Sequence, residues 1–156
     1  MWCKFFCILF LLSCTKLDSK LFEEPIDLNI KLLTPSQQEP FSIMKYEFEK
    51  MFNIQPSQLK CDLEISIKYR TTNAGIASTA FAINQTLILT TSYVFKCNNE
   101  WKLEKTSVLT NEFTQQQEQT VGQYVAEKHF LEEISKLMAK EIYDEIGLFI
   151  LLKRSQ

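Results

Sequence analysis

The fold of this chain is decided by residues 59–113, which read LKCDLEISIKYRTTNAGIASTAFAINQTLILTTSYVFKCNNEWKLEKTSVLTNEF. Apolar and polar residues alternate from Cys61 to Tyr69, and the alternation returns over residues 81–95 and more weakly over residues 101–113. Successive side chains of a strand point to opposite faces, so each run predicts a strand with one apolar face. The stretch therefore predicts three long β-strands of one sheet, whose apolar face the flanking segments must cover.

Two turns are predicted between these strands. Thr71–Thr79 forms the first connection, and its Asn73-Ala74-Gly75 segment supplies turn residues, with Gly75 at the centre. Asn98-Asn99-Glu100 forms a tighter second turn. The strand between them, Ala80–Lys96, carries small rather than clearly polar residues on its second face. Two interpretations of that face stay open, namely a cover supplied by a partner, or a twisted strand with a bulge.

The segments on either side supply one more strand and two helices. Ile26–Leu33 alternates like a first strand, and Thr34–Pro40 follows as a loop with two prolines. Phe41–Met51 has apolar residues at helical spacing, and this helix should stop near Asn53 because Pro56 disfavours helical geometry before it.

A long closing helix is predicted from Thr120 onward, after an exposed glutamine-rich connection over Asn111–Gln119. Thr120 and Gln123 match a capping box, and Gly147 either ends this helix or is tolerated inside it. The sequence therefore predicts an α+β fold in the order β-α-β-β-β-α. It is a four-stranded, mostly antiparallel sheet with two helices on one face.

Length and composition limit the class of protein. The 156 residues suffice for one domain, which needs no disulfide or metal for its stability. A net charge of −2 argues against a nucleic-acid partner, because phosphate neutralisation needs a basic surface. Only 3 glycines are present, too few for a glycine-rich phosphate-binding loop.

The N-terminus has the pattern of an export signal. Lys4 precedes a short apolar run, Phe5–Leu12, which is far below the length of a membrane span. The run ends in Leu11-Leu12-Ser13-Cys14, which resembles a bacterial lipobox. This resemblance predicts a signal peptide over residues 1–13 and a diacylated, N-acylated Cys14. Residues 14–25 would then be a tether and residues 26–156 a single α+β domain. The alternatives are an ordinary cleaved signal or a buried N-terminal strand.

After such processing, Cys61 and Cys97 are the remaining thiols besides Cys14. Export invites a disulfide between them. A hairpin centred on Gly75, however, places the partner of Cys97 several residues upstream of Cys61, and bridging needs Cα atoms within about 7 Å. The spacing therefore favours two small buried thiols over a disulfide.

Catalytic and metal-binding patterns are scarce. His129 is the only histidine, and its charged neighbours indicate a solvated helix position rather than a ligand or a base. One histidine and scattered cysteines do not provide the ligands of a usual zinc site, and no Gly-x-Ser-x-Gly motif occurs. We expect no metal, no cofactor and no enzymatic activity.

The chain resembles the LPS-assembly lipoprotein family, the LptE family. The resemblance lies in the lipobox, in the order of elements and in residues 82–95, AINQTLILTTSYVF, which are similar to the long third strand of that family. It extends to Val125–Lys128 and Ile134–Ile146, which look like the family's closing helix. The chain departs from the family in the Asn98-Asn99 turn, where glycine is usual, and in the glutamine-rich connection after Phe113.

This resemblance implies a lipid-anchored protein on the periplasmic face of the outer membrane. Thr15 agrees with that site, because an aspartate there commonly retains such proteins at the inner membrane. Members of the family plug an LptD-like β-barrel, assist its assembly and bind lipopolysaccharide. Lys68, Arg70 and Asn73, in and beside the first connection, are the candidate contacts with lipopolysaccharide or the barrel. The alternative is a periplasmic lipid carrier or a lipoprotein associated with an ABC transporter.

Overall fold

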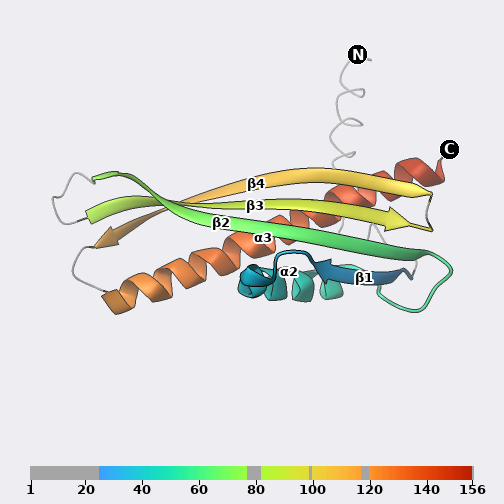
Figure 1. Cartoon of the computed structure of the whole chain (residues 1–156), viewed down its shortest axis with the longest axis horizontal. Coiled ribbons are helices and arrows are strands. Elements are labelled where there is room, and N and C mark those ends of the chain that lie inside the picture. The colour runs from blue at the N-terminus through green and yellow to red at the C-terminus, as the bar shows by residue number, and fades with distance from the viewer. Residues whose placement is uncertain (1–24, 77–81, 99, 117–119, 156) are drawn as a thin grey trace, which may run out of the picture.

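The computed structural model describes residues 25–76, 82–98, 100–116 and 120–155, which form a sheet and two long helices (Figure 1). The elements in chain order are β1 (Asp27–Leu32), the short 3₁₀ helix η1 (Pro35–Gln37), α2 (Gln38–Met51), β2 (Lys60–Ile76), β3 (Ala82–Cys97), β4 (Trp101–Gln116) and α3 (Thr120–Arg154). The strands lie side by side in the order β1-β2-β3-β4. The predicted α+β fold, β-α-β-β-β-α, is confirmed.

The sheet is antiparallel except at β1. Strands β2, β3 and β4 form an antiparallel meander, whereas β1 runs parallel to β2, from Asp27 opposite Lys60 to Leu32 opposite Ile65. A parallel pair needs a crossover connection, and α2 is part of that crossover. Because β1 has only 6 residues and β2 has 17, β1 covers just the first part of the β2 edge.

The core lies between one face of the sheet and the two helices, which both lie on that side (Figure 1). The strand side chains that fill it occupy alternate positions, as the sequence pattern predicts. On β2 and β3 they are Cys61, Leu63, Ile65, Ile67, Leu87, Leu89, Thr91, Tyr93, Phe95 and Cys97. From the helices, Met44 and Phe48 of α2 and Ile134, Met138, Ile142 and Ile146 of α3 are buried against them. The ring of Phe52, directly after α2, meets the ring of Tyr143 of α3 edge to face at 4.8 Å between centroids.

The connection between β2 and β3 lies farther along the chain than the sequence predicts. β2 continues through Thr71 and Asn73 to Ile76, which pairs with Ile83 of β3, so the chain reverses between those two residues. Gly75 lies within β2, next to a register shift between Asn73 and Gly75. A bulge there explains the glycine, because irregular strand positions often need backbone angles that a side chain disfavours.

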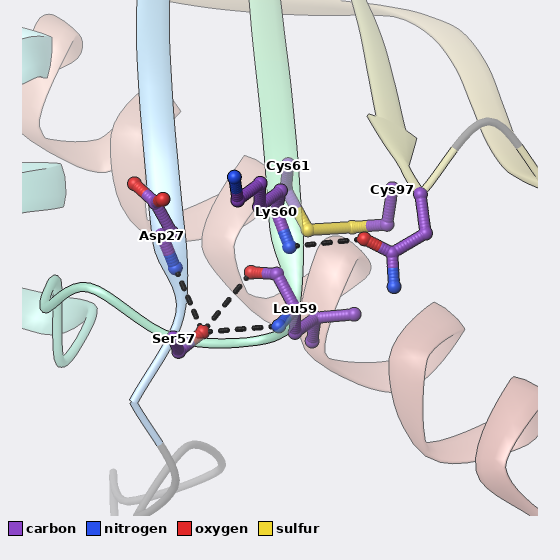
Figure 2. Close-up of a disulfide and its surroundings, with 7 residues drawn as sticks. Asp27, Ser57, Leu59, Lys60, Cys61 and Cys97 are labelled. Atoms are coloured by element: carbon purple, nitrogen blue, oxygen red, sulfur yellow. Dashed lines mark hydrogen bonds between the residues drawn. A yellow bond between two sulfur atoms is a disulfide. The ribbon is translucent and has the colours of Figure 1, made fainter.

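Cys61 and Cys97 form a disulfide, with their Cα atoms 4.1 Å apart (Figure 2). They are partners in the β2–β3 register, and both are buried. The expectation of two free thiols is therefore wrong. It placed the hairpin centre at Gly75, whereas the observed reversal lies farther along the chain, and this brings Cys61 opposite Cys97.

Hydrogen bonds around the disulfide fix the end of the sheet where β1 and β2 begin. The Ser57 hydroxyl accepts hydrogen bonds from the amides of Asp27 and Leu59, at 3.2 Å and 3.1 Å (Figure 2).

The turn predicted at Asn98 is confirmed. Asn98 has a positive φ of 48°, which asparagine tolerates, and its side-chain oxygen accepts a 3.1 Å hydrogen bond from the Lys60 amide.

The ends of β4, α2 and α3 can be compared with the sequence prediction. β4 extends to Gln116, so the glutamine-rich connection is mostly strand, while α2 already begins at Gln38, with Pro40 in its first turn. Proline is tolerated there because first-turn amides have no intrahelical acceptor. α3 continues through Gly147, because Ile146 and Ile150 on either side are buried in the core. The capping box at Thr120 involves side chains outside the described part of the chain.

Candidate functional site: a groove at the free edge of β2

The candidate site begins where β1 ends. Two contacts close the β1–β2 pairing: the Leu33 amide donates to the Ile65 carbonyl at 2.7 Å, and the Ile67 amide donates to the Thr34 hydroxyl at 2.8 Å. Beyond Ile67, no strand of the described residues pairs with this side of β2. Since odd-numbered residues direct their amides and carbonyls to this side, the backbone of Tyr69 and Thr71 forms a free strand edge.

An open groove of about 550 Å³ lies along this edge. The residues that line it come from η1 and its N-terminal flank, from β2, and from β3. They are Thr34, Ser36, Gln37, Ile67, Lys68, Tyr69, Arg70, Ile88 and Thr90. The groove therefore combines hydroxyl groups, an amide and two cations with the side chains of two isoleucines and a tyrosine.

Lys68 and Arg70 are the charged groups of the groove. Both are exposed on the sheet face that the helices do not cover, opposite Thr90 and Ile88 in the strand register. Neither forms an ion pair within the described residues, whereas Glu64, earlier on the same face, pairs with Lys96 at 3.4 Å. The groove thus presents two positive charges that no carboxylate of the described chain neutralises, in a form suited to a phosphate or carboxylate ligand.

Gln37 adds an unused acceptor to the groove. Its side-chain oxygen is buried and has no hydrogen-bond partner among the described residues. Buried polar atoms of folded proteins almost always have a partner, so this oxygen is an unsatisfied acceptor in the wall of the groove.

A smaller cavity of about 130 Å³ adjoins the groove through Tyr69, which lines both. Its charged groups already have partners within the chain. The Thr71 hydroxyl donates to Glu127 at 3.1 Å, and Lys128 lies 3.6 Å from Glu39. These contacts join β2, α3 and α2, so the cavity is best explained as part of the packing between the elements.

The most perturbed titratable groups lie elsewhere, where β3, β4 and α3 meet. The Tyr93 hydroxyl donates to one oxygen of Glu145, and Lys105 donates to the other at 2.8 Å. Burial, assisted by the Glu145 hydrogen bond, raises the pKa of Tyr93 well above its usual range. Burial acts to raise the pKa of Glu145, but the hydrogen bonds from Lys105 and Tyr93 outweigh it and leave that pKa lowered. With every polar atom paired, this cluster is suited to holding the helix on the sheet.

The structure brings together two of the sequence-predicted site residues. Lys68 and Arg70 share the groove, but they lie within β2 and not in a connecting loop. Asn73 also lies in β2, and its side chain, like Cys14, lies outside the described part of the chain. Sequence reasoning missed Thr34, Ser36 and Gln37. No local pattern marks them, because their role depends on where β1 stops along β2.

The described residues also bear on membranes and metals. None of the helices combines the length and the hydropathy of a transmembrane segment. No group of three or more His, Cys, Asp or Glu side chains in the described ranges is arranged to hold a metal ion.

The comparison with known proteins rests on structure. No protein-family model and no curated protein matches the chain by sequence. Among solved structures, rare lipoprotein B from Shewanella oneidensis is similar, with a TM-score of 0.65 and 7% sequence identity, over 84% of this chain and 99% of that chain. A minor lipoprotein from Acinetobacter baumannii is similar with a TM-score of 0.52 and 13% identity, over 80% of this chain and 92% of that chain.

A third similar structure is a protein described as a lipoprotein from Caulobacter crescentus. Its TM-score is 0.51 at 10% identity, and the match covers 82% of this chain and 91% of that chain. All three matches span most of both chains, so they concern the whole sheet-and-helix unit and not one motif. At these identities the likeness shows a shared fold: the chain has the fold of bacterial lipoproteins of the rare lipoprotein B type.

Proposed function

We propose that this protein is a non-catalytic outer-membrane lipoprotein that acts as the plug and assembly subunit of a lipopolysaccharide translocon. The observation that carries the proposal is the fold that the chain shares with bacterial lipoproteins over most of its length. That fold follows a segment in which Leu11-Leu12-Ser13-Cys14 resembles a lipobox. The sequence resemblance to the LptE family, which lies in the lipobox, the order of elements, the third strand and the closing helix, supports the same proposal.

The disulfide gives independent support for export. Disulfides persist in oxidising compartments such as the bacterial periplasm and are rare in the cytosol. Cys61 and Cys97 are paired and buried in the β2–β3 hairpin. A lipoprotein on the periplasmic side of the outer membrane would fold where such a bond forms and stays.

The groove supports a role in binding lipopolysaccharide, which carries phosphate and hydroxyl groups on its sugars. Lys68 and Arg70 supply cations for phosphate, and Thr34, Ser36 and Thr90 supply hydroxyl groups for sugar oxygens. The groove is open rather than enclosed, as suits a ligand that is passed on. Its position on β2 also leaves the strand edge accessible to the wall of a barrel.

The lipid-carrier alternative has less support from the fold. A carrier of this architecture would hold lipid between the sheet and the helices. In this protein that space is filled by the core, in which Phe48, Leu89 and Met138 are fully buried. The described chain thus offers contact surfaces on its outside rather than a lipid chamber within.

Affinity purification tests the proposed function directly. The full chain with a C-terminal tag is expressed in its own cells, extracted in a mild detergent and analysed by mass spectrometry. We expect an outer-membrane β-barrel of several hundred residues to be recovered in stoichiometric amount. Recovery of an inner-membrane transporter or of bound phospholipid alone would instead favour the carrier.

Two matched cysteine variants sharpen this experiment. We expect Cys14→Ala to lose most of the barrel, because the proposed anchor is gone, and Cys7→Ala, within the proposed signal peptide, to retain it. If Cys14→Ala recovers the barrel as well as the unchanged chain does, lipid anchoring is not part of the function.

A further inference from the structure

The last two turns of α3 carry an exposed apolar surface. Leu148, Leu151 and Leu152, here called the leucine patch, are 59%, 46% and 56% exposed. Residues three and four apart lie on the same face of a helix, so the three side chains form one surface. That surface points away from the core, in which Ile150 of the same turns is buried. Core packing thus explains one side of the helix end and leaves the leucines on the other side unexplained.

Basic residues follow the leucine patch directly. Lys153 and Arg154 are exposed, and residues 148–155 contain no acidic side chain. Leucines on one helix face with Lys and Arg beside them are typical of helices that bind the surface of an anionic membrane.

The patch lies at the end of the domain where the proposed tether enters. The Phe149 ring contacts the ring of Phe95 at 6.4 Å between centroids. Phe95 pairs with Leu63, only two residues along β2 from Cys61, which pairs with Leu28 of β1. Figure 1 shows β1 beginning and α3 ending toward the same end of the long axis. An extended tether of residues 14–25 reaches at most about 40 Å, so acyl chains on Cys14 would hold this end near the membrane.

We propose that the leucine patch, with Lys153 and Arg154, is a second membrane contact that docks the end of α3 onto anionic phospholipid head groups. The proposal rests on the proposed lipid anchor, because that anchor keeps the patch beside the leaflet. The leucines enter the boundary between head groups and acyl chains, and the two cations meet lipid phosphates. Two attachments at one end of the domain orient its long axis, and with it the groove on β2, relative to the membrane.

Fluorescence quenching by brominated lipids tests this contact. The protein is purified from membranes and reconstituted in vesicles of phosphatidylethanolamine and phosphatidylglycerol at a ratio of roughly 3:1, a composition rich enough in anionic lipid to attract basic residues. Trp101→Phe removes the background fluorescence of the domain, and Leu151→Trp places a reporter in the patch. Leu137→Trp is the matched control, since Leu137 is 60% exposed on the same helix. It lies about 21 Å farther from the helix end.

We expect lipids brominated in their acyl chains to quench the Leu151→Trp reporter by roughly half or more, since interfacial helices insert their apolar face to that depth. The Leu137→Trp reporter should be quenched much less. Adding Lys153→Glu with Arg154→Glu, or replacing phosphatidylglycerol with phosphatidylcholine, should reduce the quenching at position 151. Equal quenching of the two reporters, or none at position 151, would overturn the contact.

The mass of the N-terminal peptide, measured on the same sample, separates the two proposals. An acylated Cys14 with an unquenched Leu151→Trp reporter rejects the membrane contact and leaves the lipid anchor standing. A quenched reporter on a chain without acyl groups rejects the anchor and shows that the patch binds lipid unaided.

Discussion

Lys68 and Arg70 lie two residues apart on one face of β2, about 7 Å from each other along the strand. Their side chains reach the same groove, and the described chain offers them no carboxylate. A single surface cation in water attracts a phosphate only weakly, because solvent screens the charge. Two cations beside hydroxyl groups can bind one phosphorylated sugar from several directions, which makes the pair more selective than either residue alone.

We expect the double variant Lys68→Ala, Arg70→Ala to bind purified lipopolysaccharide about tenfold more weakly, which corresponds to the loss of about 1.4 kcal/mol of charge-assisted hydrogen bonding. A fluorescence titration at low and moderate salt measures the effect, and the difference should shrink as salt rises. The control Lys45→Ala, Lys140→Ala removes the same charge from the two helices. Equal affinity of the two double variants would exclude the groove as the binding site.

The disulfide between Cys61 and Cys97 is a second feature that depends on individual residues. Cys61 and Cys97 are 36 residues apart in sequence, and their bond ties the start of β2 to the end of β3. A cross-link of this span restricts the unfolded chain more than a bond between near neighbours does, because it closes a longer loop.

Replacing both cysteines with alanine should lower the free energy of unfolding by about 4 kcal/mol, the loop-entropy estimate for a link of this length. Urea unfolding of the unchanged chain and of the double variant measures the difference. Thiol labelling of the denatured, unreduced protein provides a check, since Cys61 and Cys97 should not react. Labelling of both residues would show that the bond is absent in the cell.

At the scale of elements, the short β1 strand creates the groove. β1 covers the edge of β2 only as far as Ile65. The next amide on this edge, that of Ile67, donates a hydrogen bond to the Thr34 hydroxyl. From there the chain turns into η1 and leaves the edge open. The groove is therefore the space that remains where a 6-residue strand is paired with a 17-residue strand.

Thr34→Val should test this edge contact. Valine keeps the shape of threonine but cannot accept the Ile67 hydrogen bond, so we expect a loss of stability of about 1–2 kcal/mol, the usual cost of an unsatisfied buried amide. Thermal unfolding measures this loss, and hydrogen exchange at Ile67 should become faster. Thr34→Ser keeps the hydroxyl and should behave nearly like the unchanged chain. A valine variant as stable as the serine variant would show that water replaces the hydroxyl without cost.

The elements could largely be predicted from the sequence because the apolar residues of each follow its period. The alternation from Cys61 to Tyr69 gives the buried face of β2, and the spacing of Ile134, Met138 and Ile142 gives that of α3. The place of the β2–β3 reversal could not be predicted in the same way. Gly75 marks a bulge rather than a turn, and an error of a few residues there displaced Cys61 from Cys97.

The candidate site could be predicted only in part. Lys68 and Arg70 could be proposed as contacts because they are cations beside an expected loop. Thr34 and Gln37 could not, because they join the groove only through the parallel pairing of β1 with β2. That pairing depends on long-range register, which the local period of a strand does not contain.

At the scale of the whole molecule, the proposed membrane attachments and the groove lie at different positions along the domain. The leucine patch lies at the end of the domain where β1 begins (Figure 1), whereas the groove lies farther along β2, past the end of β1. A domain held at that end would present the free edge of β2 and its two cations away from the anchor. Under the proposed function, this arrangement would leave the groove accessible to a barrel and its lipid cargo.

The central claim, a domain anchored by lipid at Cys14, is tested most directly by the mass of the mature N-terminal peptide. The protein is purified from its own membranes, digested and analysed by mass spectrometry. We expect the mature chain to begin at Cys14 and to carry a diacylglycerol group on the sulfur and a fatty acid on the amino group. A chain that keeps residues 1–13, or one that begins elsewhere with an unmodified amino group, would contradict the account.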